Sequence, residues 1–232
     1  MPVALVTGGA KGIGAGIADR LARDGWQVVV ADRDPDGAAP PNGRYVICDA
    51  GDEAAVAMLV DSIGRIEQRL DTLICNAGFM IRKPIADLSL AEWSSVLTTN
   101  LTSTFLLVRA AEALLRSARG SVVTIASSRA RMSEPNTESY SASKGGLVAL
   151  THALAISLGP DIRVNCISPG WIATKGPEPT EAEHAFHPAG RGGLVEDIAA
   201  LVAFLVGPDS GFITGAEFLV DGGVTRKMIY PD

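Results

Sequence analysis

The sequence predicts an α/β fold in which a doubly wound, seven-stranded parallel sheet is covered by helices on both faces. Short apolar runs alternate with segments of helical periodicity from the start of the chain, and this order is typical of a parallel sheet. The apolar runs are nearly continuous, as strands buried on both faces require. With 232 residues, 47% hydrophobic content and 25 glycines, the chain fits one compact domain with many tight turns.

The predicted elements follow in chain order. Strands are expected at VALVT (3–7), VVVAD (28–32), YVICD (45–49), TLIC (72–75), SVVTIAS (121–127), IRVNCIS (162–168) and EFLVD (217–221). Helices are expected over residues 12–24, 52–69, 89–116, 139–158 and 195–206, where apolar residues recur at helical spacing. The proline-rich stretches 35–41 and 176–188 are predicted to be loops. Residues 1–232 therefore form a single domain.

Composition excludes several classes of protein. The net charge is −6 and no lysine or arginine run occurs, so we expect no nucleic-acid partner. No apolar run approaches the ~18 residues that span a bilayer, and the N-terminus lacks signal-peptide features, so we expect no membrane partner. Cys48, Cys75 and Cys166 are odd in number and lie in or beside apolar runs, which favours buried, reduced thiols and a cytoplasmic protein. His184 and His187 lack other ligands at metal-binding spacing, so no metal site is expected.

The segment TGGAKGIG after the first strand indicates a dinucleotide-binding loop. Its glycines, Gly8, Gly12 and Gly14, permit a tight turn and close backbone approach. The helix that opens at Gly12 and Ile13 offers unpaired N–H groups to a pyrophosphate. A strand, these glycines and a helix at the N-terminus form a stronger signal together than the glycines alone.

Asp32, at the end of the second strand, favours NAD. Its carboxylate can accept hydrogen bonds from both ribose hydroxyls and would repel a 2′-phosphate. NADP stays possible because Lys11 or Arg33 could pair with that phosphate. Asp49, after the third strand, could accept from the adenine amino group or could simply cap a turn.

Asn76, Ala77 and Gly78 follow the fourth strand. These small residues would let the backbone contact the adenosine ribose, although an Asn-Ala-Gly turn would need no cofactor. Asn100 lies inside a predicted helix, where asparagine is unfavourable unless its amide or a helix distortion serves a purpose.

Tyr140 and Lys144 are four residues apart in a predicted helix, so their side chains project from one face. Using the phenol as a base near neutral pH requires lowering its pKa by roughly 3 units, or ~4 kcal/mol. A cation at ~4 Å supplies about 4 kcal/mol at an effective dielectric of ~20. Ser127 would donate to the substrate oxygen, and the three groups indicate acid/base chemistry on a hydroxyl. Alternatively, such a Tyr/Lys pair is ordinary helix surface.

Taken together, the motifs resemble those of the short-chain dehydrogenase/reductase family, in its short single-domain branch, over almost the whole chain. The glycine loop, residues 76–78 and the tetrad Asn100, Ser127, Tyr140 and Lys144 are similar to the family's motifs. The segment Pro169-Gly170-Trp171-Ile172-Ala173-Thr174 is similar to the loop that holds the nicotinamide amide. The resemblance implies a Rossmann-like fold, with Lys144 lowering the phenol pKa and binding the nicotinamide ribose, and Asn100 anchoring a water.

The expected activity is NAD(P)-dependent interconversion of a secondary alcohol and a ketone, on a small sugar, polyol or hydroxy acid. Arg129, Trp171 and His187 are the candidate substrate residues. Arg129 and Arg131, just past Ser127, hint at an anionic or polyhydroxylated substrate, or are solvated loop arginines. The substrate-covering loop, residues 174–194, is short, and the tail 224–232 would dock on a neighbouring subunit of a tetramer or dimer.

Two alternatives stay open at this stage. One is an NADPH-dependent 3-oxoacyl carrier-protein reductase, against which Asp32 argues. The other is a non-catalytic dinucleotide sensor or scaffold, which would need neither the phenol nor the serine.

Overall fold

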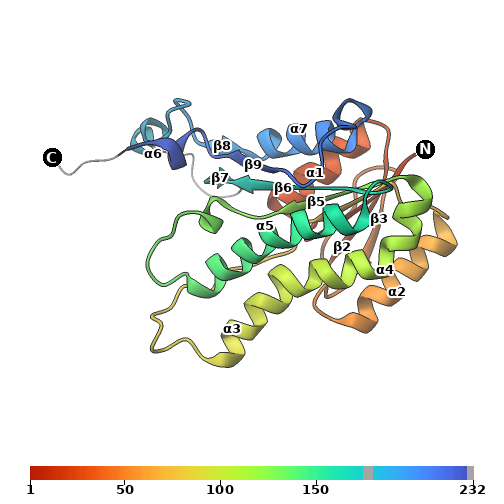
Figure 1. Cartoon of the computed structure of the whole chain (residues 1–232), viewed down its shortest axis with the longest axis horizontal. Coiled ribbons are helices and arrows are strands. Elements are labelled where there is room, and N and C mark those ends of the chain that lie inside the picture. The colour runs from red at the N-terminus through yellow and green to blue at the C-terminus, as the bar shows by residue number, and fades with distance from the viewer. Residues whose placement is uncertain (175–179, 229–232) are drawn as a thin grey trace.

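A seven-stranded parallel sheet forms the centre of the protein (Figure 1). The structure is a computed structural model that describes residues 1–174 and 180–228. The strand order is β3-β2-β1-β4-β5-β6-β9. The strands are β1 Val3–Thr7, β2 Gln27–Asp32, β3 Arg44–Ile47, β4 Thr72–Cys75, β5 Ser121–Ile125, β6 Arg163–Pro169 and β9 Glu217–Val220. All seven predicted strands and their parallel arrangement are confirmed.

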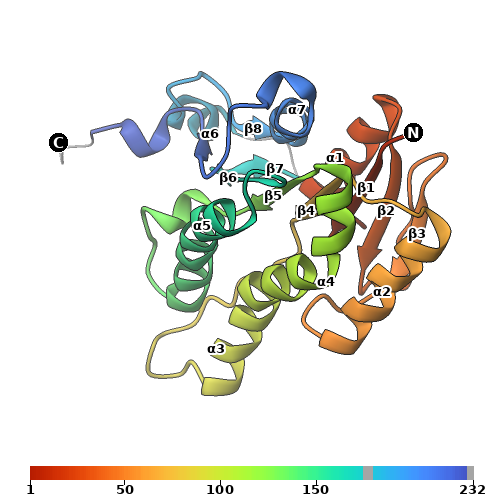
Figure 2. The same cartoon turned by 45° about the vertical axis from the view of Figure 1, so that its right-hand side comes forward.

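Helices cover both faces of the sheet, as predicted (Figure 2). They are α1 Gly12–Arg23, α2 Glu53–Ile66, α3 Leu90–Leu97, α4 Ser103–Ala118, α5 Glu138–Leu158, α6 Glu181–Phe186 and α7 Val195–Val206. Side chains alternate between the faces along β1: Val3 and Leu5 pack with α2, α4 and α5, whereas Ala4 and Val6 pack with α1 and α7. Each face therefore contributes to its own apolar core.

The local sequence fixes where several helices begin and end. Asp52 caps α2, because its carboxylate accepts from the backbone N–H groups of Ala54 and Ala55. Ser89 and Glu92 form a capping box at the start of α3. The helix α4 ends at Arg119, whose left-handed φ of 50° terminates the helix.

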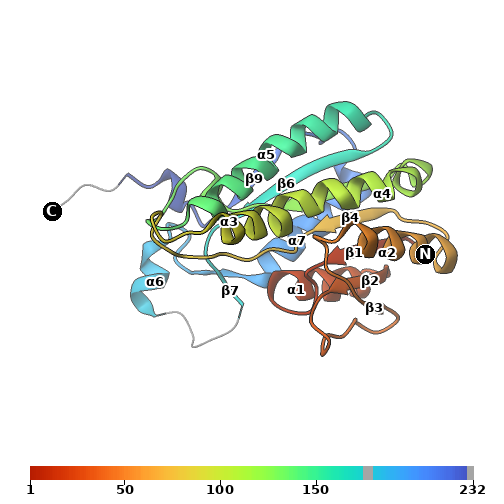
Figure 3. The ribbon, with the colours of Figure 1, turned by 90° about the horizontal axis from the view of Figure 1, so that it is seen from below.

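The long helix predicted over residues 89–116 is divided in the structure. A π-helical turn at Thr98–Thr102 separates α3 from α4, although the two helices still follow one line (Figure 3). Asn100 lies in this turn and is 1% exposed. A helix distortion around a buried asparagine is one of the two outcomes expected from its mid-helix position, and π-helical turns often occur at functional sites.

The predicted loop over residues 176–188 contains a helix that sequence patterning missed. The helix α6 starts with a capping box formed by Thr180 and Glu183. A two-stranded ribbon, β7 Ile172–Ala173 with β8 Gly193–Leu194, brackets the same segment. Residues 175–179 of the expected substrate loop and residues 229–232 of the expected tail lie outside the described residues.

The described part of the tail contacts its own chain. Lys227 donates a hydrogen bond from Nζ to the Phe186 carbonyl at 3.3 Å and lies 5.2 Å from that ring's centroid. Cys48, Cys75 and Cys166 are buried free thiols, as predicted. In the part of the chain that the structure describes, no helix is long and apolar enough to cross a membrane.

Candidate active site

A large cavity runs along the carboxyl ends of the parallel strands. Its volume is about 1450 Å³, more than the roughly 300–1,000 Å³ typical of a pocket for one small ligand. A lining residue directly follows each of six strands, β1 to β6; these residues are Gly8, Arg33, Cys48, Asn76, Ala126 and Gly170. The sheet topology thus collects the candidate motifs at one edge, with room for a dinucleotide and a small substrate.

The glycine loop packs too tightly for side chains. Gly8 has a left-handed φ of +64°, and a Cβ there would lie 2.7 Å from Ala77 Cα; a Cβ on Gly14 would collide with the Gly8 carbonyl. Asn76 holds the loop by donating from Nδ2 to the carbonyls of Thr7 and Gly8, at 3.1 and 2.9 Å. Small residues at positions 76–78 therefore serve loop packing, and Asn76, Ala77 and Gly78 also line the cavity.

Asp32 is fixed at the cavity wall by backbone hydrogen bonds. Its carboxylate accepts from Ala10 N at 3.0 Å and from Asp34 N at 3.2 Å. The two basic residues near Asp32 already interact with other groups. Lys11 Nζ lies 3.7 Å from the Asp34 carboxylate, and the Arg33 guanidinium lies 5.6 Å from the Phe79 ring centroid.

Asp49 lines the cavity and also closes a turn. Its Oδ1 accepts from Gly51 N at 2.8 Å, which satisfies the turn interpretation without removing the carboxylate from the cavity wall. Both sequence interpretations of Asp49 are thus compatible with its position.

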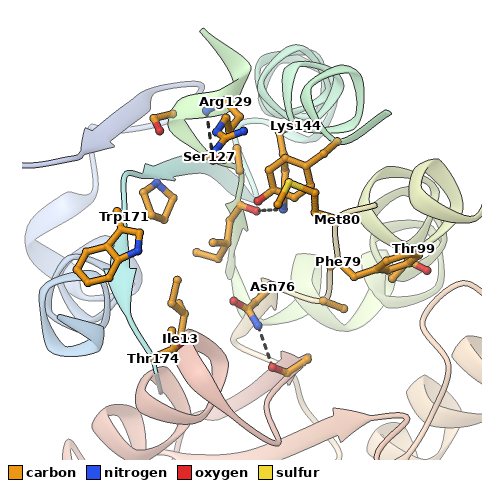
Figure 4. Close-up of a pocket in the computed structure, with 18 of the residues that line it drawn as sticks. Ile13, Asn76, Phe79, Met80, Thr99, Ser127, Arg129, Lys144, Trp171 and Thr174 are labelled. Carbon is orange, nitrogen blue, oxygen red and sulfur yellow. Dashed lines mark hydrogen bonds between the residues drawn. The ribbon is translucent and has the colours of Figure 1, made fainter. Parts of the chain in front are cut away.

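Ser127, Tyr140 and Lys144 line the same cavity, and Figure 4 shows Ser127 and Lys144 at its wall. Lys144 Nζ lies 5.6 Å from the centroid of the Tyr140 ring and donates to the Ile125 carbonyl at 2.8 Å. The Ser127 hydroxyl accepts from Arg129 N at 3.2 Å. Tyr140 and Lys144 therefore share one face of α5, and Ser127 at the end of β5 approaches them.

The pKa of the Tyr140 phenol is raised in the structure, rather than lowered as the pairing with Lys144 predicted. Burial raises the pKa of Tyr140, and this outweighs the hydrogen bond with Ser127 and the charge of Arg129, which lower it. Burial also lowers the pKa of Lys144 to about 8, because desolvation disfavours the ammonium. The charge of Arg129 opposes this rise, and the effect expected of Lys144 stays a prediction.

Asn100 sits behind the cavity wall and ties the loop after β4 to α5. Its Oδ1 accepts from Phe79 N at 2.9 Å, and its Nδ2 donates to Phe79 O at 2.9 Å and to Ser143 Oγ at 3.0 Å. Ser143 in turn donates to the Tyr140 carbonyl at 2.7 Å. The amide is therefore used for positioning, and a water held by Asn100 stays a prediction.

The candidate substrate residues Arg129, Trp171 and His187 all line the cavity. His187 is 6% exposed, with Nδ1 2.8 Å from the Glu183 carbonyl. Arg131 does not line it and instead forms an ion pair with Glu217, and both residues line a separate pocket. Of the two arginines that hinted at an anionic substrate, only Arg129 is placed for that role.

Of the remaining candidates in the predicted nicotinamide loop, some line the cavity and one packs against the apolar core. Pro169, Gly170 and Thr174 line the cavity together with Ile13 and Lys11 of the glycine loop. The Ile172 side chain is partly buried and packs against the apolar core beside α1 and α7. Gly12, with a left-handed φ of +59°, packs beside Thr174.

Sequence reasoning missed several residues of the cavity wall, which are Phe79, Met80, Met132, Glu134 and Phe186. Phe79 and Met80 directly follow the Asn-Ala-Gly motif, so their place after a strand was a usable signal. Met132 and Glu134 lie in the connection between β5 and α5, whose path depends on tertiary packing, and Phe186 ends α6, a helix that the sequence analysis missed.

The comparisons with known proteins match this architecture. A family profile described as enoyl-(acyl carrier protein) reductase matches residues 8–225. The chain is 44% identical to an uncharacterized oxidoreductase of Thermotoga maritima, over 99% of this chain and 98% of that protein. The chain belongs to the short-chain dehydrogenase/reductase family.

Other family members span several substrates. D-threitol dehydrogenase of Mycolicibacterium smegmatis is 35% identical over 97% of this chain and 93% of its own. Gluconate 5-dehydrogenase of Gluconobacter oxydans is 32% identical over 97% and 95%.

Solved structures agree with the fold in detail. A SCOR enzyme from Clostridium thermocellum has a TM-score of 0.92 and 39% identity, over 98% of this chain and 94% of that one. A 3-ketoacyl-(acyl-carrier-protein) reductase from Brucella melitensis, complexed with NADH, has a TM-score of 0.89 and 30% identity, over 97% and 98%.

The family member described here is an NAD(P)-dependent dehydrogenase or reductase, and its residues fit that cofactor. Gly8, Gly12 and Gly14 leave the backbone of this loop without side chains, so a pyrophosphate can approach it closely, and α1 begins at Gly12 in the same loop. The Asp32 carboxylate and the Thr174 side chain line the same cavity. The alternative of a non-catalytic sensor is set aside by the family relationship.

Proposed function

We propose that the protein interconverts a secondary alcohol and a ketone, with NAD as the cofactor and a small polar molecule as the substrate. The observation that carries this proposal is the convergence of Ser127, Tyr140 and Lys144 in one cavity with the glycine loop. A hydroxyl placed against Tyr140 and Ser127 would have both a proton acceptor and an oxygen ligand within one site.

In the proposed oxidation, Tyr140 takes the hydroxyl proton while Ser127 holds the substrate oxygen by a hydrogen bond. The C–H bond of the carbinol carbon breaks as the C=O bond forms. The nicotinamide ring, when bound, takes up the hydride in oxidation and supplies it in reduction. In reduction Tyr140 returns its proton to the ketone oxygen.

In this proposal Lys144 and Asn100 act on Tyr140 and on the segments around it rather than on the substrate. The Lys144 ammonium is fixed by the Ile125 carbonyl and keeps a positive charge next to the phenol. Asn100 fixes the segment at Phe79 and, through Ser143, the first turn of α5. Both residues therefore position the reacting groups.

The preference for NAD rests on the end of β2. A carboxylate at Asp32 suits two ribose hydroxyls and repels a 2′-phosphate, and its two backbone hydrogen bonds keep it in place. The Lys11 ammonium already faces Asp34, and Arg33 lies over Phe79. Neither cation is therefore a preformed phosphate site.

A second candidate is a 3-oxoacyl carrier-protein reductase, favoured by the similarity to the Brucella melitensis reductase. The two functions separate in one experiment, in which an acyl-thioester ketone with NADPH is compared with polyols and hydroxy acids with NAD. Faster turnover of the thioester with NADPH would replace the first proposal.

The proposal extends to a cytoplasmic homo-oligomer, either a tetramer or a dimer. Large apolar side chains are exposed on the outer helices and near the sheet edge, including Phe105, Ile156 and Phe212. Burial of such side chains between subunits is a common reason for their exposure in a single chain. Light scattering on the purified protein measures the oligomeric state directly, and a monomer would contradict this part.

The decisive experiment is Tyr140→Phe, which removes the hydroxyl and keeps the ring. We expect turnover to fall by about a hundredfold or more, since positioned acid/base groups contribute roughly 10²- to 10⁴-fold, while NAD binding stays unchanged. Fluorescence titration measures NAD binding separately from the absorbance assay. Unchanged turnover would refute the role of Tyr140, and loss of NAD binding would show that the substitution damaged the site itself.

A further inference from the structure

Arg129 lines the cavity, and one nitrogen of its guanidinium is buried without a hydrogen-bond partner in the described chain. Arg129 belongs to the short helical turn at Ser128–Ala130, and its side chain is 19% exposed. Its Nη2 is 2.7 Å from the Glu134 carboxylate, whereas its Nη1 is buried and has no hydrogen-bond partner among residues 1–174 and 180–228. Buried donors are nearly always paired in native proteins, so this nitrogen indicates a group that the described residues do not supply.

The charges around Arg129 do not balance. Glu134 also forms an ion pair with Arg82, so two guanidinium groups share a single carboxylate. The Arg82 charge adds to burial in lowering the pKa of Arg129, as expected for two cations held close together. This cluster, which comprises Arg82, Arg129 and Glu134, carries an excess of one positive charge, and one monoanion would neutralise it.

The other charged side chains at this end of the cavity are already engaged. Lys144 donates to the Ile125 carbonyl. The Glu183 carboxylate accepts from the backbone N–H and the hydroxyl of Thr180, at 2.7 and 2.8 Å, and caps α6. Arg129 is therefore the charged group at this end with an unfilled hydrogen-bonding position in the described chain.

Arg129 is also close to the reacting groups. It follows Ser127 by two residues, its backbone N–H donates to the Ser127 hydroxyl, and its charge acts on the Tyr140 phenol. Figure 4 shows Arg129 beside Ser127, at the side of the cavity that faces Trp171. One small molecule can therefore contact Arg129 and place a hydroxyl at Tyr140.

We propose that the substrate carries a carboxylate, bound by the Arg129 guanidinium, close to the hydroxyl that is oxidised. This inference rests on the proposed function and narrows its substrate class to hydroxy acids and sugar acids. Guanidinium geometry matches a carboxylate well, and a monoanion matches the single excess charge. A neutral polyol would leave both the charge and the donor unmatched.

The test compares acids with neutral molecules of similar shape. Wild-type enzyme and NAD are assayed with gluconate against sorbitol, threonate against threitol, and 3-hydroxybutyrate against 2-butanol. We expect higher kcat/KM for the acids by about tenfold to a hundredfold, since a hydrogen bond to a charged group contributes about 1.5–3 kcal/mol. Glucose 6-phosphate is included as a dianionic sugar, and a preference for it over every acid would overturn the assignment of a carboxylate.

The variant Arg129→Gln removes the guanidinium and its charge and leaves a shorter, neutral polar side chain. We expect KM for the preferred acid to rise by about tenfold to a hundredfold while KM for the neutral partner changes little. Because the Arg129 charge also acts on Tyr140, kcat should change to a similar extent for both substrates. Arg131→Gln is the matched control, because Arg131 is two residues away and pairs with Glu217 outside the cavity. It should leave both substrates unaffected.

Calorimetry separates failure of this inference from failure of the proposed function. If neutral polyols are oxidised, acids are not, and Arg129→Gln changes nothing, the carboxylate site is refuted while the dehydrogenase proposal stands. If no substrate is turned over, the proposed function fails. Binding of the acids to wild type but not to Arg129→Gln, measured by titration calorimetry, would still support the carboxylate site.

Discussion

Replacing Asn100 by alanine tests whether the π-helical turn positions the reacting groups. The Asn100 amide is 1% exposed and makes three hydrogen bonds, two to the Phe79 backbone and one to Ser143 Oγ. The variant would leave the N–H and C=O of Phe79 without these partners. Ser143 would lose one of its contacts between the π turn and α5.

The loss of stability follows from these bonds. An unsatisfied buried polar group costs about 1–3 kcal/mol, and the partial exposure of Phe79 lets water satisfy some of the lost bonds. We therefore expect a total loss of about 1–3 kcal/mol, which lowers the melting temperature by about 2–12 °C for a protein of this size. Thermal unfolding followed by circular dichroism measures this change.

The loss of activity should exceed what instability explains. Misplacement of a reacting group by about 1 Å can cost about a hundredfold in rate, so we expect kcat to fall by about ten- to a hundredfold at a temperature where the variant is folded. Asn165→Ala is the matched control. Asn165 is equally buried, and its amide bonds Ile213 O and Ala216 N in the segment before β9, away from the cavity.

Asn165→Ala should lower the melting temperature by a similar amount and leave kcat unchanged. If Asn100→Ala also leaves kcat unchanged while lowering stability, the amide only supports the fold, and the positioning role assigned to Asn100 is refuted.

Two further predictions concern the cofactor. Gly8→Ala should weaken NAD binding by about tenfold or more, because a left-handed alanine costs about 1–2 kcal/mol and its Cβ would meet Ala77. The control is Gly64→Ala, since a Cβ at this position on α2 meets no other atom. It should bind NAD normally in the same fluorescence titration. Asp32→Ser should shift the ratio of the NADP and NAD dissociation constants toward NADP by about tenfold, since a repulsive charge is removed. Asp36→Ser, in the exposed turn nearby, should leave the ratio unchanged, and an unchanged ratio in Asp32→Ser would argue against the assigned role of Asp32.

Local sequence patterns predicted the sheet because each strand is a short apolar run bounded by turn residues. The strand β1, for example, is buried at all five positions. The same logic located the cavity, since the carboxyl ends of parallel strands meet at one edge. Tyr140 and Lys144 could be paired from their spacing alone, because a helix brings such residues to one face.

What the sequence could not provide depends on contacts between distant segments. Asn100 was recognised as unusual, but its bonds to Phe79 and Ser143 join the loop after β4 to α5 and have no local signature. The pKa of Tyr140 depends on burial by the whole fold, which the spacing of Tyr140 and Lys144 does not reveal. Arg129 and Arg131 are equivalent in the sequence, and only tertiary packing sends one to the cavity and the other to Glu217.

The pH dependence of oxidation tests the central role of Tyr140 most directly. The phenol accepts a proton only when it is deprotonated, and burial raises its pKa, so the active form becomes more abundant as the pH rises. Lys144 titrates nearby, with a pKa of about 8. The pH profile of oxidation therefore reports the combined titration of Tyr140 and Lys144. We predict that kcat/KM for oxidation by wild type rises steadily between about pH 6 and pH 9, and that the residual activity of Tyr140→Phe lacks this rise. Equal oxidation rates at both ends of that range in wild type, or the same rise in Tyr140→Phe, would contradict the account.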